Sequence, residues 1–305
     1  MVNMDDAEGQ EMYQVLEESI VVASVSGGKD STALSLFLKE QGIEHRRVFA
    51  DTGWEHPSTL EHIEYLKTVL GPIDTVGREG GMVELVKEKG MFPSRIARFC
   101  TEKLKVQPIQ AYLDALPEPA VSVVGIRALE SRSRANLPEW EWQKGFDCWT
   151  WRPLIDWTVD DVIAIHKRHG IRPAPLYLDY NVNRVGCWPC IFAKKKEIEK
   201  VANISPEKID LIEELESEVL EIQRARRTQT EQDLIDQGEK TEFSPTFFNR
   251  TIPGSPKNHG VKIRDAVAWS ETGWGGKPRE EMFSIDDTGC MRWGLCDTSG
   301  DEDIF

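Results

Sequence analysis

The sequence feature that most constrains the fold is a glycine-rich turn, Ser26-Gly27-Gly28-Lys29-Asp30-Ser31. It follows a short apolar, β-branched run at residues 19–25, typical of a buried parallel strand, and helical spacing resumes over residues 31–39. Two glycines let the backbone turn sharply and present N–H groups, and a helix N-terminus adds positive potential. The pattern therefore predicts a strand–turn–helix unit that binds a phosphate or pyrophosphate, with Lys29 supplying charge and Asp30 holding Mg²⁺. The alternative is a plain strand-to-helix turn.

The same alternation of strand and helix continues along the chain. Strand-like runs occupy residues 45–50 and 120–124, and helical spacing follows the first of them through residue 70. This order predicts an α/β fold with a doubly wound parallel sheet covered on both faces. Thr158 is a predicted helix N-cap, and Ser205-Pro206 is predicted to open a long helix. We expect a nucleotide-binding domain with a cysteine-bearing loop at residues 1–200 and a helical and irregular C-terminal appendage at 201–305.

Composition limits the classes of function. The 305 residues carry 37 Lys and Arg against 52 Asp and Glu, a net charge of −15. A protein that binds duplex nucleic acid by electrostatics alone usually has a basic excess, so we expect any contact with nucleic acid to be local or to involve partner subunits. No apolar run reaches the ~18 residues of a membrane span, and the acidic start is unlike a signal peptide. The expected location is cytoplasmic, with no membrane partner.

The six cysteines are spaced as reduced thiols or metal ligands of a cytosolic protein would be. Cys187 and Cys190 form a CxxC pair, which alone fits a redox pair, half a zinc site or two buried thiols. Cys148 is predicted to be a core residue. Five tryptophans between residues 140 and 157 indicate either a tightly packed part of the core or a stacking platform.

The turn differs from the GxxxxGK[ST] of P-loop NTPases and from the GxGxxG of dinucleotide folds. It resembles the SGGxDS motif of the PP-loop family, whose members split ATP between the α- and β-phosphates. Over about residues 19–195 the chain resembles the phosphoadenosine phosphosulfate reductase branch of that family. Four further segments carry the resemblance: Asp51-Thr52-Gly53, residues 98–105, the GxRxxES match at residues 125–131, and the cysteine-bearing loop at 183–190.

The resemblance implies an adenine nucleotide alpha hydrolase-like fold and a set of site residues. The residues predicted to bind the nucleotide are Ser26, Gly27, Gly28, Lys29, Asp30, Ser31, Asp51, Thr52, Gly53, Lys105, Gly125, Arg127, Glu130, Ser131 and Arg132. Arginines at 127, 132 and 134 can grip an anionic group by bidentate hydrogen bonds, unless they form a solvated cluster paired with Glu130. The predicted catalytic residues are Lys29, Asp30, Arg127 and Cys296.

The resemblance also bears on the cysteines. In the cluster-containing adenylylsulfate reductases a double cysteine and a CxxC hold a [4Fe–4S] cluster. In this chain Phe99 replaces the first residue of the double cysteine. The resemblance therefore implies three cluster ligands, Cys100, Cys187 and Cys190. The fourth predicted ligand is Cys290 or Cys296. Zinc and plain thiols are the alternatives. The ECGLH tail of the reductases is replaced by residues 289–297, Gly-Cys-Met-Arg-Trp-Gly-Leu-Cys-Asp, which argues against thiol reduction of adenylylsulfate.

These features predict an ATP pyrophosphatase with ATP and Mg²⁺ as cofactors, which activates an acceptor for sulfur insertion. The chain resembles the ATP-pyrophosphatase subunits of DNA phosphorothioation systems. The expected partners are a sulfur donor such as a cysteine desulfurase, and DNA or tRNA with partner subunits. The alternatives are a reductase of adenylylsulfate or phosphoadenylylsulfate, a tRNA thiolation enzyme, and a nucleotide-sensing scaffold without turnover.

Overall fold

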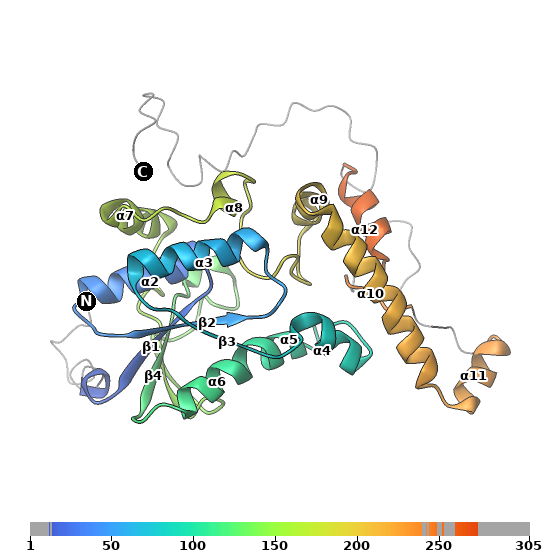
Figure 1. Cartoon of the computed structure of the whole chain (residues 1–305), viewed down its shortest axis with the longest axis horizontal. Helices are drawn as coiled ribbons and strands as arrows, with labels where there is room; N and C mark the ends of the chain where they lie inside the picture. Colours follow the sequence, from blue (N-terminus) through green and yellow to red (C-terminus); the bar gives the residue numbers. More distant parts are fainter. Residues whose placement is uncertain are drawn as a thin grey trace.

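The computed structural model describes residues 12, 14–239, 242, 244–248, 252 and 260–273 (Figure 1). At its centre is a six-stranded sheet with the strand order β3-β2-β1-β4-β6-β5. Five strands are parallel, and β5 pairs with β6 in the antiparallel sense. The strands are β1 (Ile20–Val25), β2 (Arg46–Asp51), β3 (Asp74–Gly77), β4 (Ala120–Val124), β5 (Trp140–Gln143) and β6 (Cys148–Trp151). The predicted doubly wound α/β fold is confirmed.

Helices cover both faces of this sheet. In Figure 1, α2, α3 and α7 lie on one face and α4, α5 and α6 on the other. The helices and helical turns of this region are α2 (Lys29–Glu40), α3 (Pro57–Leu70), α4 (Gly81–Lys89), α5 (Phe99–Thr101), the π-helix η1 (Glu102–Val106), α6 (Gln107–Asp114), the 3₁₀ turn η2 (Ala128–Glu130), α7 (Val159–His169) and α8 (Pro175–Leu178).

The central strand β1 is apolar at every position except Ser24. Val21, Ala23 and Val25 pack into a core that also contains apolar side chains of α2, α3 and α7. Val22, on the opposite face, packs with Val48, Leu113 and Cys148. Because successive strand residues point to opposite faces, a strand covered on both faces carries apolar residues on both of them. Cys148 is buried, as predicted.

The predicted helix starts also agree with the structure. The Thr158 hydroxyl accepts from the Asp161 N–H (3.2 Å) while the Asp161 carboxylate accepts from the Thr158 N–H (2.8 Å), a reciprocal cap at the start of α7. Of the tryptophans, Trp151 is buried and stacks on Trp140 with ring centroids 5.1 Å apart. Trp142, on the edge strand β5, is 47% exposed. Packing therefore explains Trp151, whereas Trp142 is open to solvent.

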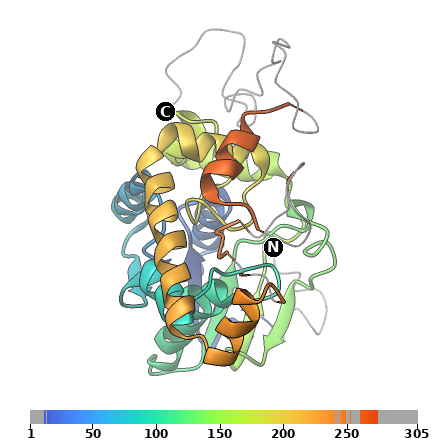
Figure 2. The ribbon, with the colours of Figure 1, turned by 90° about the vertical axis from the view of Figure 1, so that its right-hand side faces the viewer.

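Beyond residue 194 the chain forms a helical layer at one end of the sheet. It contains α9 (Lys195–Ile204), α10 (Pro206–Ala225), α11 (Gln229–Asp236) and α12 (Ile263–Ser270). Figure 2 shows α10 running along one side of the molecule with α12 beside it. The predicted boundary at residue 200 falls inside α9, and the division into two domains stays a prediction. Within the described residues, no helix combines the length and apolarity needed to cross a membrane.

Candidate functional site

The glycine-rich turn joins the carboxyl end of β1 to the start of α2, as predicted. Gly27 has φ +73°, and a Cβ there would lie 3.1 Å from Thr59 Cγ2 of α3, so the turn needs glycine at this position. Hydrogen bonds between residues of the turn hold it closed. The Ser31 hydroxyl accepts from the Ser26 N–H (3.0 Å) and donates to the Gly28 carbonyl (3.0 Å).

This closure leaves backbone donors at the helix start. Within the described part of the chain, the N–H groups of Gly27, Asp30 and Ser31 have no hydrogen-bond partner. The first N–H groups of a helix lack intrahelical acceptors and carry partial positive charge, so they favour an anion. The geometry is therefore that of a phosphate cradle.

Asp30 joins the two cations of this cradle. Its Oδ2 lies 3.0 Å from Lys29 Nζ, and its Oδ1 accepts from Arg127 Nε at 2.5 Å. Both carboxylate oxygens are thus in contact with cations. The magnesium role stays a prediction, whereas the ion pairs assign Asp30 the placement of Lys29 and Arg127.

The segment after β4 reaches the same cradle because Gly125 has no side chain. A Cβ at Gly125 would lie 2.6 Å from the carbonyl oxygen of Asp30. Arg127, which follows, is buried. Of the other two predicted arginines, Arg134 pairs with Glu130, whose carboxylate also accepts from the Arg127 N–H at 3.0 Å. Arg132 and Ser131 are exposed, and Arg132 has no ion pair among the described residues.

The turn after β2 is fixed by a carboxylate that the sequence analysis did not single out. Glu55 Oε2 accepts from the N–H groups of Thr52 and Trp54, both at 3.1 Å, and its Oε1 accepts from the Thr52 hydroxyl at 2.6 Å. Asp51 Oδ1 accepts from the Gly53 N–H at 2.8 Å. The turn thus stands at the carboxyl end of β2, next to the end of β1, where open α/β sheets bind their ligands.

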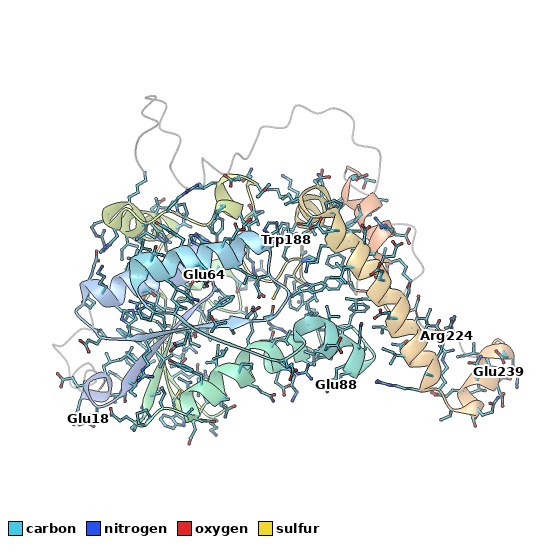
Figure 3. All side chains as sticks on the ribbon, in the orientation of Figure 1. Glu18, Glu64, Glu88, Trp188, Arg224 and Glu239 are labelled. Atoms are coloured by element: carbon cyan, nitrogen blue, oxygen red, sulfur yellow. The ribbon has the colours of Figure 1, made fainter. Side chains whose placement is uncertain are left out.

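The cysteine-bearing loop is attached to this turn. Glu55 and Cys187 form an isolated antiparallel bridge. The Trp188 N–H donates to the Trp54 carbonyl (2.7 Å), and Trp54 Nε1 donates to the Pro189 carbonyl (3.0 Å). Figure 3 labels Trp188 in the region between α3 and α10. Two tryptophans therefore join the turn after β2 to the CxxC loop.

Cys100, on α5, lies in the same apolar cluster as Cys187. Burial raises the pKa of the Cys100 thiol, and the thiolates of Cys187 and Cys190 raise it further. Cys187 and Cys190 thus lie near enough to Cys100 for their charges to act on it. Three thiols are a donor set suited to an iron–sulfur cluster, and this ligand set stays a prediction. No group of three or more His, Cys, Asp or Glu side chains within the described ranges could hold a metal ion as placed. Cys290 and Cys296 lie outside the described residues.

Lys105 lies in η1, a single turn of π-helix, which is a rare element that often marks functional sites. Its side chain is half-buried and has no ion pair in the part of the chain that the structure describes. Its predicted contact with a phosphate group stays a prediction.

Two residues of the site escaped the sequence analysis. Tyr177 of α8 is buried, and its hydroxyl accepts from the Lys29 N–H at 3.4 Å while its ring lies 5.5 Å from Lys29 Nζ. Lys208 of α10 lies over the ring of Trp54. Each contact joins segments about 150 residues apart, and no local pattern in the sequence signals either one.

The chain is similar in sequence and in fold to several known proteins. A model of the phosphoadenosine phosphosulfate reductase domain matches residues 20–193. An uncharacterized 37.8 kDa protein of Escherichia phage 186 is 35% identical over 255 residues, which is 66% of this chain and 75% of that protein. An adenosine 5′-phosphosulfate reductase of Allochromatium vinosum is 29% identical over 187 residues, 57% of this chain and 68% of that protein. A crystal structure of phosphoadenylyl-sulfate reductase from Candida auris, in complex with phosphate, matches with a TM-score of 0.47 at 18% identity, over 59% of this chain and 87% of that one.

Proposed function

Because the chain belongs to the phosphoadenosine phosphosulfate reductase family, we propose that it binds an adenine nucleotide at the turn between β1 and α2. The proposed reaction is cleavage of ATP between its α- and β-phosphates, which activates an acceptor for sulfur insertion. The observation that carries the proposal is the group of three unpartnered N–H groups at Gly27, Asp30 and Ser31. Backbone donors of this kind bind phosphate oxygens without needing a basic protein surface.

The residues of the cradle have separate tasks in this reaction. The N–H groups and Lys29 hold the β- and γ-phosphates, and Arg127 faces the α-phosphate from the other side of Asp30. An acceptor oxygen attacks the α-phosphorus, the bond to the bridging oxygen breaks, and pyrophosphate leaves with the electron pair. Catalysis then consists of positioning and of charge neutralisation by groups already in place. A sulfur nucleophile subsequently displaces AMP from the activated acceptor.

The sulfur chemistry is assigned to the loop beside the nucleotide edge. Cys100, Cys187 and Cys190 would hold an iron–sulfur cluster, with Cys290 or Cys296 as the fourth ligand. When bound there, such a cluster supplies a position for sulfide and a source of electrons. Cys296 is the proposed nucleophile of the tail if Cys290 completes the ligand set.

The proposed acceptor is a nucleic acid, received with partner subunits. The net charge of −15 favours a local contact over binding by the whole surface. The arginines at and just beyond the C-terminal end of α10 are engaged within the protein, since Arg224 and Arg227 pair with Glu242 and Arg226 donates to the Glu88 carbonyl. A sulfur donor such as a cysteine desulfurase completes the proposed set of partners.

A second candidate function is the reduction of adenylylsulfate or phosphoadenylylsulfate to sulfite. The similarity to proteins named adenosine 5′-phosphosulfate reductase favours it. The substituted tail at residues 289–297 disfavours it, because the glutamate and histidine of ECGLH are missing.

The two functions differ in substrate and product. Full-length protein purified without oxygen is incubated with Mg²⁺ and ATP in one sample, and with adenylylsulfate and a dithiol in another. Release of AMP and pyrophosphate from ATP, lost in Asp30→Ala, supports the first function. Release of sulfite from adenylylsulfate, with ATP left intact, would replace it by the second.

A further inference from the structure

Lys208 is a half-buried cation that the appendage brings to the cysteine loop. It lies in the first turn of α10, outside the region that matches the family domain. Its Nζ stands 3.8 Å from the centroid of the Trp54 ring. Among the described residues, no carboxylate comes within the 4.0 Å of an ion pair with Lys208. A lysine that gives up part of its hydration without gaining a carboxylate partner is costly unless another anion compensates.

The position of Lys208 relative to Cys187 follows from the residues beneath it. Trp54 is adjacent to Glu55, and Glu55 is bridged to Cys187. The Glu55 carboxylate is already engaged by the Thr52 hydroxyl and by the N–H groups of Thr52 and Trp54. Trp54 Nε1 also donates to the Pro189 carbonyl, so Lys208 lies over a ring that is bonded to the loop between Cys187 and Cys190.

The start of α10 is anchored in this place by a buried hydrogen bond. Trp188 Nε1, from the cysteine loop, donates to the Ser205 hydroxyl at 3.0 Å. Ser205 precedes the first residue of α10, so this bond fixes the helix start against the loop. Lys208, one turn further, is held over Trp54 by the same contact and by its interaction with the ring.

The electrostatics agree with this placement. Burial lowers the pKa of Lys208, whereas Glu55, Glu207 and the Cys187 thiolate raise it. Burial lowers the pKa of His56, Glu207 and Glu61 raise it, and Lys208 lowers it. Lys208 thus acts on His56 through space.

We propose that Lys208 makes the space beside Cys187 a subsite for a small anion, and that this anion is the sulfur-bearing group in transit, a hydrosulfide or a persulfide. The identity of the anion rests on the proposed function, but the subsite itself does not. The C-terminal appendage then contributes a binding residue to a site whose other residues belong to the family domain. Lys208 attracts and orients the anion and takes no part in bond making.

The test compares two alkylating reagents of the same reactivity type and different charge. Iodoacetate is an anion and iodoacetamide is neutral, and both react with the thiolate. The ratio of the iodoacetate rate to the iodoacetamide rate at one cysteine therefore reports the local electrostatic potential. It is insensitive to the pKa of the thiol. The ratio is measured at Cys187 by mass spectrometry on full-length protein freed of metal by chelation. We expect Lys208→Met to lower the ratio about fivefold, and Lys208→Arg to retain it.

Three controls make the result decisive. Lys196→Met removes an exposed lysine of α9 and is expected to leave the ratio unchanged. Cys148 is buried, so its alkylation in any variant would reveal unfolding. In the wild type alone, added salt is expected to reduce the ratio at Cys187 toward the value of free cysteine, which tests the inference even if Lys208→Met does not fold.

Equal ratios in the wild type, Lys208→Met and Lys196→Met would overturn the inference, as would a ratio independent of salt. The assay contains no nucleotide, so it is separate from the ATP assay. A protein that cleaves ATP but shows no effect of Lys208 refutes only the subsite. A protein that shows the effect but does not cleave ATP refutes only the proposed reaction.

Discussion

At the scale of single residues, the pairing of Asp30 with Arg127 determines how the phosphate cradle is held. The Arg127 side chain is 6% exposed and its Nε is 2.5 Å from Asp30 Oδ1. We expect Arg127→Ala to lower the free energy of unfolding by about 3 kcal/mol, because it leaves a nearly buried carboxylate with one partner. It should also weaken ATP binding at least about tenfold, a loss of about 1.4 kcal/mol. Urea unfolding and calorimetric titration with ATP measure the two effects.

Arg134→Ala is the matched control. Arg134 pairs with Glu130 at a more exposed position, where ion pairs contribute little to stability. We expect a change below about 1 kcal/mol. Equal losses in the two variants would contradict a special role for the Asp30–Arg127 pair.

The buried histidine His62 predicts a dependence of stability on pH. Burial lowers its pKa to about 4 from an ordinary value of 6.5, with smaller contributions from His166 and Arg172. The unfolded chain therefore takes up a proton below pH 6.5 that the folded chain refuses until about pH 4. The free energy of unfolding should fall as the pH drops through this range, by about 3 kcal/mol in total from His62.

Chemical unfolding at a series of pH values measures this effect, and His62→Phe should flatten the slope between pH 6.5 and 4. The pKa of His166 is also lowered by burial, so part of the slope should remain in the variant. An identical slope in the variant and the wild type would show that His62 is already charged when folded.

At the scale of elements, the close approach of β4 to α2 depends on Gly125. Gly125→Ala would place a methyl group 2.6 Å from the Asp30 carbonyl oxygen, so the two elements would have to separate. We expect a loss of about 2 kcal/mol in stability and a clear weakening of nucleotide binding. Gly145→Ala, where a Cβ meets nothing within 4 Å, should be close to neutral. Thermal unfolding and ATP titration of both variants provide the comparison.

The appendage depends on one buried carboxylate in α10. Glu216 accepts from the N–H groups of Phe247 (3.0 Å) and Ile263 (3.2 Å), and burial raises its pKa. Glu216→Ala leaves both donors without a partner and should cost about 3 kcal/mol. We expect faster proteolytic cleavage near Phe247 and Ile263 than in Glu213→Ala, which removes only an exposed partner of Arg264. Equal cleavage rates in both variants would show that Glu216 is not an anchor.

How much of these elements could be predicted from the sequence depends on the range of the interactions involved. Some elements depend only on interactions between residues close in the sequence, and the local pattern was sufficient to predict them. They are the turn at 26–31 with its flanking strand and helix, the cap at Thr158 and the start of α10. The β5–β6 hairpin was not predicted, although the alternation Trp140-Glu141-Trp142-Gln143 was a usable signal. The contacts of Tyr177 with Lys29 and of Lys208 with Trp54 depend on how distant segments pack, which no local pattern encodes.

At the scale of the whole molecule, the region that matches the family domain and the C-terminal helices meet at the cysteine loop. The loop is bonded on one side to the turn after β2 and on the other to the start of α10. The nucleotide cradle, the cysteines and the appendage are thus joined by Trp54 and Trp188. Under the proposed function, this arrangement would place nucleotide activation and sulfur transfer at one edge of the sheet.

The measurement that tests this account most directly is a ³¹P NMR spectrum of ATP and Mg²⁺ incubated with the full-length protein under anaerobic conditions. Cleavage at the α-phosphate predicts the resonances of AMP and pyrophosphate, and their absence with Asp30→Ala. Formation of ADP and inorganic phosphate, or ATP that stays intact while bound, would contradict the proposed reaction.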